Sequence, residues 1–152
     1  MFLLPYRRVE VESRRSPEEI AELLRQKTSP RQPWFRSLTG SGFEFTGSVS
    51  SNEFRIMPVI QGQNTYQPWL VGQISPHARG STIRVIETFH PLQIVIIVAF
   101  FALGGLVGMR TAGPKSFLMA GSAFLLFHLI MYFIGFLPEA RKAERRIRDL
   151  VE

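Results

Sequence analysis

The sequence predicts an α+β domain followed by a helical membrane hairpin. The chain has 152 residues, of which 45% are hydrophobic, and these residues are unevenly distributed. Its first 90 residues mix charged and apolar side chains, whereas no acidic residue occurs between Thr88 and Pro138. Only Arg110 and Lys115 carry a full charge within that stretch. We therefore expect a cytoplasmic α+β domain over residues 1–90, a transmembrane hairpin over 91–137 and a basic amphipathic tail over 138–152.

The domain begins with a strand and a helix. Residues 6–12 alternate apolar and charged side chains, which is typical of a half-exposed strand. Ser16, Pro17 and Glu19 then form the pattern of a helix start, with a Ser cap, a first-turn Pro and a Glu three residues after the cap. A short helix to about Lys27 follows from this pattern, and residues 29–33 read as a loop.

From Phe43 onward the pattern changes to a period of two, which predicts an antiparallel meander. Four strands are expected, over 43–49, 54–56, 66–74 and 81–89. Pro58 and Pro68 cannot donate to a ladder, so the strands there should be at an edge, bulged or interrupted. The predicted module is a small antiparallel β-sheet with one helix, in the order β-α-β-β-β-β. Its aromatic residues could be core residues or interfacial anchors; they are Trp34, Phe35, Tyr66 and Trp69.

Two apolar runs, 91–109 and 117–137, are separated by a short loop, 110–116. As helices, each run reaches roughly 30 Å, which is the thickness of a hydrocarbon core. A chain of this size has too little other protein to bury two helices that are apolar all round. The turn residues Gly113 and Pro114 favour an antiparallel hairpin with both ends of the protein on one side.

Basic residues close to the helix ends indicate the orientation. Arg79 and Arg84 precede the first run, and five basic residues follow the second, against two in the loop. We therefore expect a two-pass protein of a bacterial cytoplasmic, or equivalent internal, membrane with both termini in the cytoplasm. The start of the chain has too short an apolar run for a secretory signal.

Each apolar run carries glycines at helical spacing. Gly104 and Gly108 form a GxxxG pattern, which allows another helix to approach closely. In the second run one face combines small and polar side chains, namely Gly121, Leu125, His128, Tyr132 and Gly135. A stripe that faces lipid should be uniformly apolar, so we expect Gly104, Gly108, Gly121, Tyr132 and Gly135 to be helix-packing residues.

His128 lies near the middle of the second run, where a polar side chain usually faces protein or a ligand. An interhelical hydrogen bond is one interpretation. Axial ligation of a haem or chlorophyll-type pigment is another, because imidazole is a common ligand for both and the flanking glycines would admit a flat ring. A proton relay is the third.

The tail places Ala140, Ala143, Ile147 and Leu150 on one helical face. This amphipathic segment could lie on anionic lipid or pair with the domain. In the first case its basic side chains would contact lipid headgroups, and they are Arg141, Lys142, Arg145, Arg146 and Arg148.

The order of strands, the stretch 64–74 and the following Thr82-Ile83-Arg84-Val85 resemble a group of small bacterial membrane proteins of unknown function. These have a β-rich cytoplasmic domain followed by a transmembrane helical hairpin. The resemblance covers roughly residues 40–137 and implies the architecture; it implies no catalytic residue.

The sequence contains no motif of a known chemistry. Cysteine is absent, which excludes thiolate catalysis and Cys-based metal sites. There is no phosphate-binding GxxxxGK[ST], no HExxH and no GxSxG. Glu87 and His90 are the only plausible acid/base pair, and as a lone ExxH at a strand end they do not indicate a metal site.

The net charge of +6 forms no stripe interleaved with exposed aromatic residues, so no nucleic acid is expected as a partner. The expected function is that of a non-enzymatic accessory or scaffold subunit that packs through its glycine faces against a larger membrane complex or itself. A pigment-, haem- or lipid-binding protein that uses His128 is the first alternative. A membrane-surface enzyme that uses Glu87 and His90 is the second.

Overall fold

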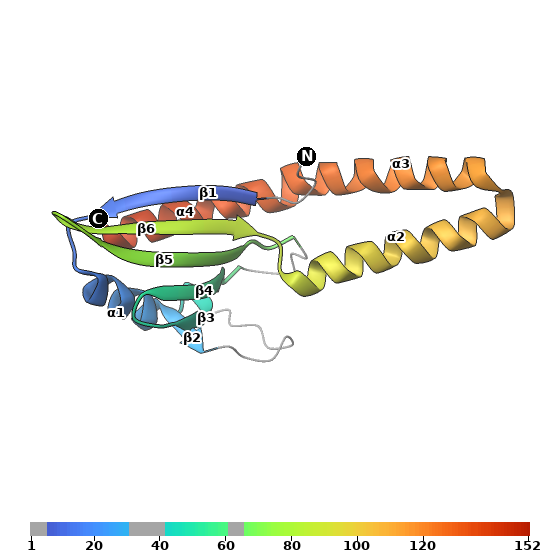
Figure 1. The fold of residues 1–152 in the computed structure, drawn as a ribbon. Helices are drawn as coiled ribbons and strands as arrows, with labels where there is room; N and C mark the ends of the chain where they lie inside the picture. Colours follow the sequence, from blue (N-terminus) through green and yellow to red (C-terminus); the bar gives the residue numbers. More distant parts are fainter. Residues whose placement is uncertain (1–5, 31–41, 61–65) are drawn as a thin grey trace.

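The computed structural model describes residues 6–30, 42–60 and 66–152. A six-stranded sheet forms one end of the molecule, and a long helical hairpin projects from it (Figure 1). In chain order the elements are β1 Tyr6–Ser13, α1 Pro17–Lys27, β2 Thr28–Pro30, β3 Phe45–Val49, β4 Glu53–Pro58, β5 Trp69–His77, β6 Gly80–Thr88, α2 Pro91–Ala112, α3 Pro114–Met131, η1 Tyr132–Phe136 and α4 Leu137–Val151. The predicted α+β class, with a hairpin and a C-terminal helix after the sheet, is confirmed.

The strands lie in the order β1-β6-β5-β4-β3-β2, and all neighbours are antiparallel except β2 and β3. Helix α1 therefore carries the chain from one edge of the sheet to the other. The short strand β2 is an addition to the five strands expected from the sequence. Only three residues form it, and Pro30 is one of them, so neither alternation nor length distinguishes it from a loop.

Helix α1 begins as its sequence predicts. The Ser16 hydroxyl accepts from the backbone N–H of Glu19 at 3.2 Å, and the Glu19 carboxylate accepts from the backbone N–H of Ser16 at 2.9 Å. This reciprocal pair satisfies two backbone donors that would otherwise lack partners. Ile20, Ala21 and Leu24 form the buried side of the helix.

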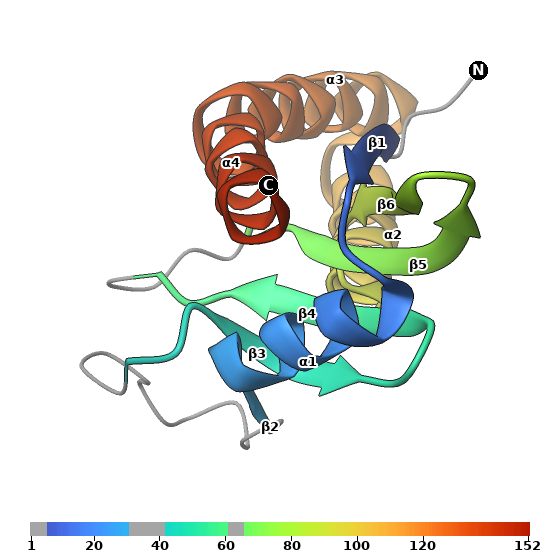
Figure 2. The same ribbon diagram turned by 90° about the vertical axis from the view of Figure 1, so that its left-hand side faces the viewer.

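Helices α1 and α4 cover the same face of the sheet, as the view along the sheet shows (Figure 2). Alternate residues of every long strand point into this core. Gly72 leaves the room that Phe54 occupies, because a Cβ atom there would lie 2.0 Å from the Phe54 ring. Helix α4 adds four buried side chains to the sheet side of the molecule, which are Ala140, Ala143, Ile147 and Val151.

The helical hairpin is more continuous than the sequence suggests. Residues 110–116 were expected to form a loop, whereas α2 continues to Ala112 and α3 begins at Pro114. Gly113 alone makes the turn, with φ of +79°, a conformation that other residues rarely adopt. The end of an apolar run marks where lipid contact would stop, and the backbone can stay helical beyond it. At the other end, η1 joins α3 directly to α4, so the second long helix returns to the sheet without a break.

Candidate functional site

Two helical segments of the structure are long and apolar enough to cross a membrane. They are Gln93–Arg110 and the continuous helix Leu118–Val151. The rest of the protein buries only 11% of the apolar stretch in the first segment and 6% of the apolar stretch in the second. A core helix of a soluble protein would be mostly covered. The exposed side chains are large and apolar, and include Val98, Phe100, Leu118, Met119 and Ile134. The hairpin therefore presents an apolar surface on nearly all sides.

Within the hairpin, α2 and α3 meet through aromatic and glycine residues. The rings of Phe101 and Phe124 lie 5.5 Å apart. A Cβ atom at Gly121 would be 3.4 Å from the Phe101 ring, so this glycine already packs against the neighbouring helix. Gly105 is buried at the same interface. Gly121 thus lies on the side of α3 that faces α2, and its role in helix packing stays a prediction.

Gly104 lies in a different environment. It is exposed, and a Cβ atom added there would meet no other part of the described chain within 4 Å. Gly108, one turn later, is partly buried. The GxxxG pair thus runs along the flank of the hairpin, with Gly104 open to the outside. Packing of this pair against another protein stays a prediction.

His128 lies half-buried on α3 among aromatic rings. Its Nδ1 is 2.9 Å from the carbonyl oxygen of Phe124, and since a carbonyl only accepts, Nδ1 carries the proton. The rings of Phe124, Phe127 and Tyr66 lie 4.1, 5.5 and 6.0 Å from the imidazole. Ligation of a haem or pigment by His128 stays a prediction, as does a proton relay.

An aromatic cluster joins the hairpin to the sheet. Tyr66, Phe89, Phe136 and Ala140 are buried together, with Tyr132 packed against them. Phe89 meets Phe136 at 5.0 Å, and Tyr132 stacks on Phe136 at 5.3 Å. The π-helical turn η1 places these rings at the junction, and such turns often mark functional positions. Burial also raises the pKa of the Tyr66 hydroxyl.

Of the four aromatic residues whose role was left open, Tyr66 is a core residue and Trp69 is half-buried at the start of β5. Trp69 packs edge-on against His90, with centroids 4.8 Å apart, directly before α2. Trp34 and Phe35 lie outside the described residues. Glu87 points to the face of the sheet that α4 covers, whereas His90 contacts the Trp69 ring. The two side chains of this predicted acid/base pair therefore lie in different environments.

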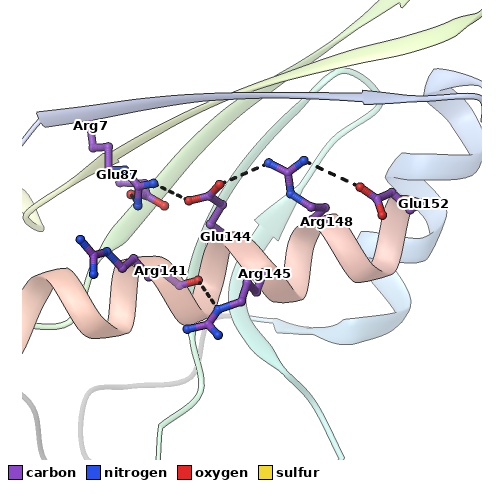
Figure 3. Close-up of polar contacts among 7 residues, drawn as sticks. All are labelled: Arg7, Glu87, Arg141, Glu144, Arg145, Arg148 and Glu152. Carbon is purple, nitrogen blue, oxygen red and sulfur yellow. Dashed lines mark hydrogen bonds and ion pairs between the residues drawn. The ribbon is translucent and has the colours of Figure 1, made fainter.

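A cluster of charges lies between the sheet and α4 (Figure 3). Arg7 of β1 contacts two carboxylates: its Nη1 is 3.4 Å from Glu87 of β6, and its Nη2 is 2.6 Å from Glu144 of α4. Glu144 also accepts from Arg148, which reaches Glu152 in turn. Val9, Val11, Val85 and Ile147 line the narrow crevice around the two carboxylates.

Burial raises the pKa of the Glu87 carboxyl to about 7. This pKa is the net result of burial, which is the largest effect, of the Arg7 guanidinium, which lowers it, and of the nearby Glu144 carboxylate, which raises it. The Oε1 atom of Glu87 has no hydrogen-bond partner within the described part of the chain. With a pKa of about 7, the Glu87 carboxyl is divided between its protonated and its charged form near neutral pH.

The five basic residues of α4 expected at lipid headgroups fall into two groups. Three of them have partners within the protein. Lys142 pairs with Glu139 at 2.7 Å, and Arg146 donates to the Val59 carbonyl at 3.2 Å. Arg148 forms ion pairs with Glu144 and Glu152. Arg141 and Arg145 make no ion pair among residues 6–30, 42–60 and 66–152. The buried face of α4 meanwhile packs on the sheet, which is the domain-pairing alternative for the tail.

Sequence reasoning missed the contact between Arg7, Glu87 and Glu144. The signal was nevertheless present, because Arg7 and Glu87 each take an inward position in a strand whose other inward residues are mostly apolar. The register pairs these two residues directly. Charged residues at inward positions of two strands indicate an ion pair if the strands are neighbours, and β1 and β6 are neighbours in this sheet.

Among the described residues no group of three or more His, Asp or Glu side chains could hold a metal ion. No protein-family model matches the chain, and no curated protein is significantly similar to it.

Proposed function

We propose that the protein is a non-enzymatic accessory or scaffold subunit of the bacterial cytoplasmic membrane. In this proposal α2 and α3 cross the bilayer and the sheet domain stands in the cytoplasm with both termini. The hairpin packs through its glycine-bearing flank against a larger membrane complex or against a second copy of the chain. The observation that carries the proposal is Gly104, which is exposed on an apolar helix and has open space above its Cα atom.

Small residues let helices in a membrane approach closely enough for their backbones to touch. Gly121 faces the Phe101 side chain inside the hairpin, where an added Cβ atom would lie 3.4 Å from the ring. Among the residues that the structure describes, Gly104 has no such neighbour within 4 Å of the position of an added Cβ atom. A partner helix would therefore find its closest approach there.

The charge cluster supports a structural role for Glu87. Arg7 binds this carboxylate and Glu144 together, so it links the sheet to α4. A general base needs access to a substrate proton. Glu87 is fully buried, which favours an anchoring role over catalysis.

The test replaces Gly104 by Ile and follows what travels with the protein through extraction in a mild detergent and crosslinking. A Cβ atom at this position meets nothing within 4 Å in the described part of the chain, so we expect the hairpin to fold with Ile there. We expect the co-purifying subunit, or the crosslinked dimer, to be lost. Ala99→Ile is the matched control, because Ala99 is also exposed but lies on another side of α2. Equal recovery of the partner with both variants would refute the proposal.

A further inference from the structure

We infer that Arg141 and Arg145 form a binding site for the phosphate group of an anionic phospholipid. The site lies on α4, directly beyond the apolar part of the second long helix. The inference deepens the proposed function and rests on its membrane assignment. It also narrows the basic surface of α4 from five residues to two.

Most of the acidic residues in and next to α4 already form ion pairs. Every carboxylate that could neutralise the basic face, apart from Asp149, is already taken: Glu139 by Lys142, Glu144 by Arg7 and Arg148, and Glu152 by Arg148. The segments 1–5, 31–41 and 61–65 contain no acidic residue, so they offer no counter-ion. Arg141 and Arg145 are both exposed. Two cations one helical turn apart therefore keep their charge available for an outside anion.

The side chains of Arg141 and Arg145 point in the same direction along α4. Figure 3 shows both extending toward the N-terminal end of α4, which is the end that joins the apolar helices. Arg145 is fixed in this direction, because its Nε donates to the Arg141 carbonyl at 3.3 Å. The two guanidinium groups thus point toward the level at which a bilayer surface would lie.

Arg141 and Arg145 lie close to the end of the second apolar run. Arg141 follows the last residue of the apolar run, Leu137, by four positions, or about 6 Å of helix. The headgroup layer extends about 5 to 8 Å beyond each side of the hydrocarbon core. Arg145 starts about 12 Å from Leu137, and its side chain runs back toward the membrane end.

Guanidinium groups offer several donors in a flat fork that matches phosphate oxygens.

The experiment uses the full chain in bilayers that contain phosphatidylcholine and phosphatidylglycerol, followed by release in a mild detergent and native mass spectrometry of the retained lipids. The unaltered protein should retain phosphatidylglycerol in preference to phosphatidylcholine. We expect the double variant Arg141→Gln/Arg145→Gln to lose about 30-fold of this preference. Each basic side chain near an anionic surface contributes about 1 kcal/mol, and two of them together correspond to that factor.

The control is Arg55→Gln/Arg79→Gln, which removes the same charge from exposed positions on the sheet domain. This variant should retain phosphatidylglycerol like the unaltered protein. Equal loss in both double variants would show that net charge alone attracts the lipid and would refute the site. Displacement of the lipid by soluble glycerol phosphate would assign the site to a free phosphate compound and would also refute it.

Alkaline extraction of the same membranes separates this inference from the proposed function. If the protein stays in the membrane and the Arg141→Gln/Arg145→Gln variant keeps its lipid preference, the lipid site fails and the membrane assignment stands. If alkali removes the unaltered protein, the membrane assignment fails, and the lipid site fails with it.

Discussion

At the scale of the residue, Glu87 has the most unusual environment among the charged groups of the sheet domain. Its side chain is completely covered, and Arg7 is its ionic partner at 3.4 Å. Burial makes the charged carboxylate unfavourable, and the shared guanidinium compensates for only part of that cost. The pKa of Glu87 is therefore raised from 4.5 to about 7.

This raised pKa predicts a pH dependence of stability. The folded protein holds the Glu87 proton more tightly than the unfolded chain does, so the contribution of Glu87 to the free energy of unfolding is largest below about pH 4.5 and decreases until the pH passes about 7. The decrease that Glu87 contributes should be about 3 kcal/mol, from the size of the shift. Chemical unfolding in detergent, followed by tryptophan fluorescence across this pH range, measures it.

Glu87→Gln should remove this component of the pH dependence, because an amide does not titrate in this range. Glu10→Gln is the control, since Glu10 pairs with Arg84 on the exposed face of the sheet. If the unaltered protein and Glu87→Gln have the same dependence between pH 4.5 and pH 7, the carboxyl at Glu87 is not protonated in the folded state.

At the scale of the element, α4 belongs to the sheet domain although the hairpin separates the two in sequence. Its buried face contributes Ala143, Ile147 and Val151 to the main core, next to the side chains of α1. The Ser13 hydroxyl donates to the Val151 carbonyl at 2.5 Å, which ties the end of α4 to the end of β1. An amphipathic helix that lay on the lipid would bury this face in the membrane.

Ile147→Ala distinguishes these two positions of α4. Removal of three buried carbons should lower the free energy of unfolding of the sheet domain by about 2 to 5 kcal/mol. Thermal unfolding, followed by the circular dichroism signal of the sheet, provides the measurement. Asp149→Ala, at an exposed position of the same helix, should have little effect. An equally small effect of both variants would mean that α4 does not pack on the sheet in the membrane-bound protein.

At the scale of the whole molecule, the hairpin brings the last helix back to the sheet at the end from which α2 leaves it (Figure 1). The sheet and α4 must therefore lie on one side of any bilayer that α2 and α3 cross. The turn at Gly113 then lies on the other side. Arg110 and Lys115 flank this turn, and the greater number of basic residues at the sheet end favours a cytoplasmic sheet.

Single cysteines test this arrangement, because the chain has no cysteine of its own. The positions are Arg79 in the β5–β6 turn, Lys115 near the hairpin turn and Glu152 after α4. In intact cells a membrane-impermeant maleimide should label Lys115→Cys alone, and lysis should make Arg79→Cys and Glu152→Cys reactive. Labelling of Lys115→Cys and Glu152→Cys on the same side would exclude the hairpin; the reverse pattern would keep the hairpin and invert its orientation.

Local signals predicted the elements well. The capping residues Ser16 and Glu19 lie three positions apart, and each apolar run is contiguous, so short windows of sequence contain the whole pattern. The ion pairs of Arg7, by contrast, join residues that are far apart in the sequence. Arg7 meets Glu87 across 80 positions and Glu144 across 137, and these contacts depend on which strands become neighbours and on where α4 docks. No local pattern encodes that, although the two charges at inward strand positions mark where a partner is needed.

The division of one hydrophobic core between residues on both sides of the hairpin has a consequence for biosynthesis. The face of the sheet that α4 covers stays open while the ribosome adds α2 and α3, because Ala143, Ile147 and Val151 come last. If only one of the two apolar helices entered the membrane, α4 would emerge in the opposite compartment and could not reach the sheet. The sheet domain can thus be completed only when both helices have been inserted correctly. A half-inserted chain would expose an apolar surface that chaperones and membrane proteases recognise.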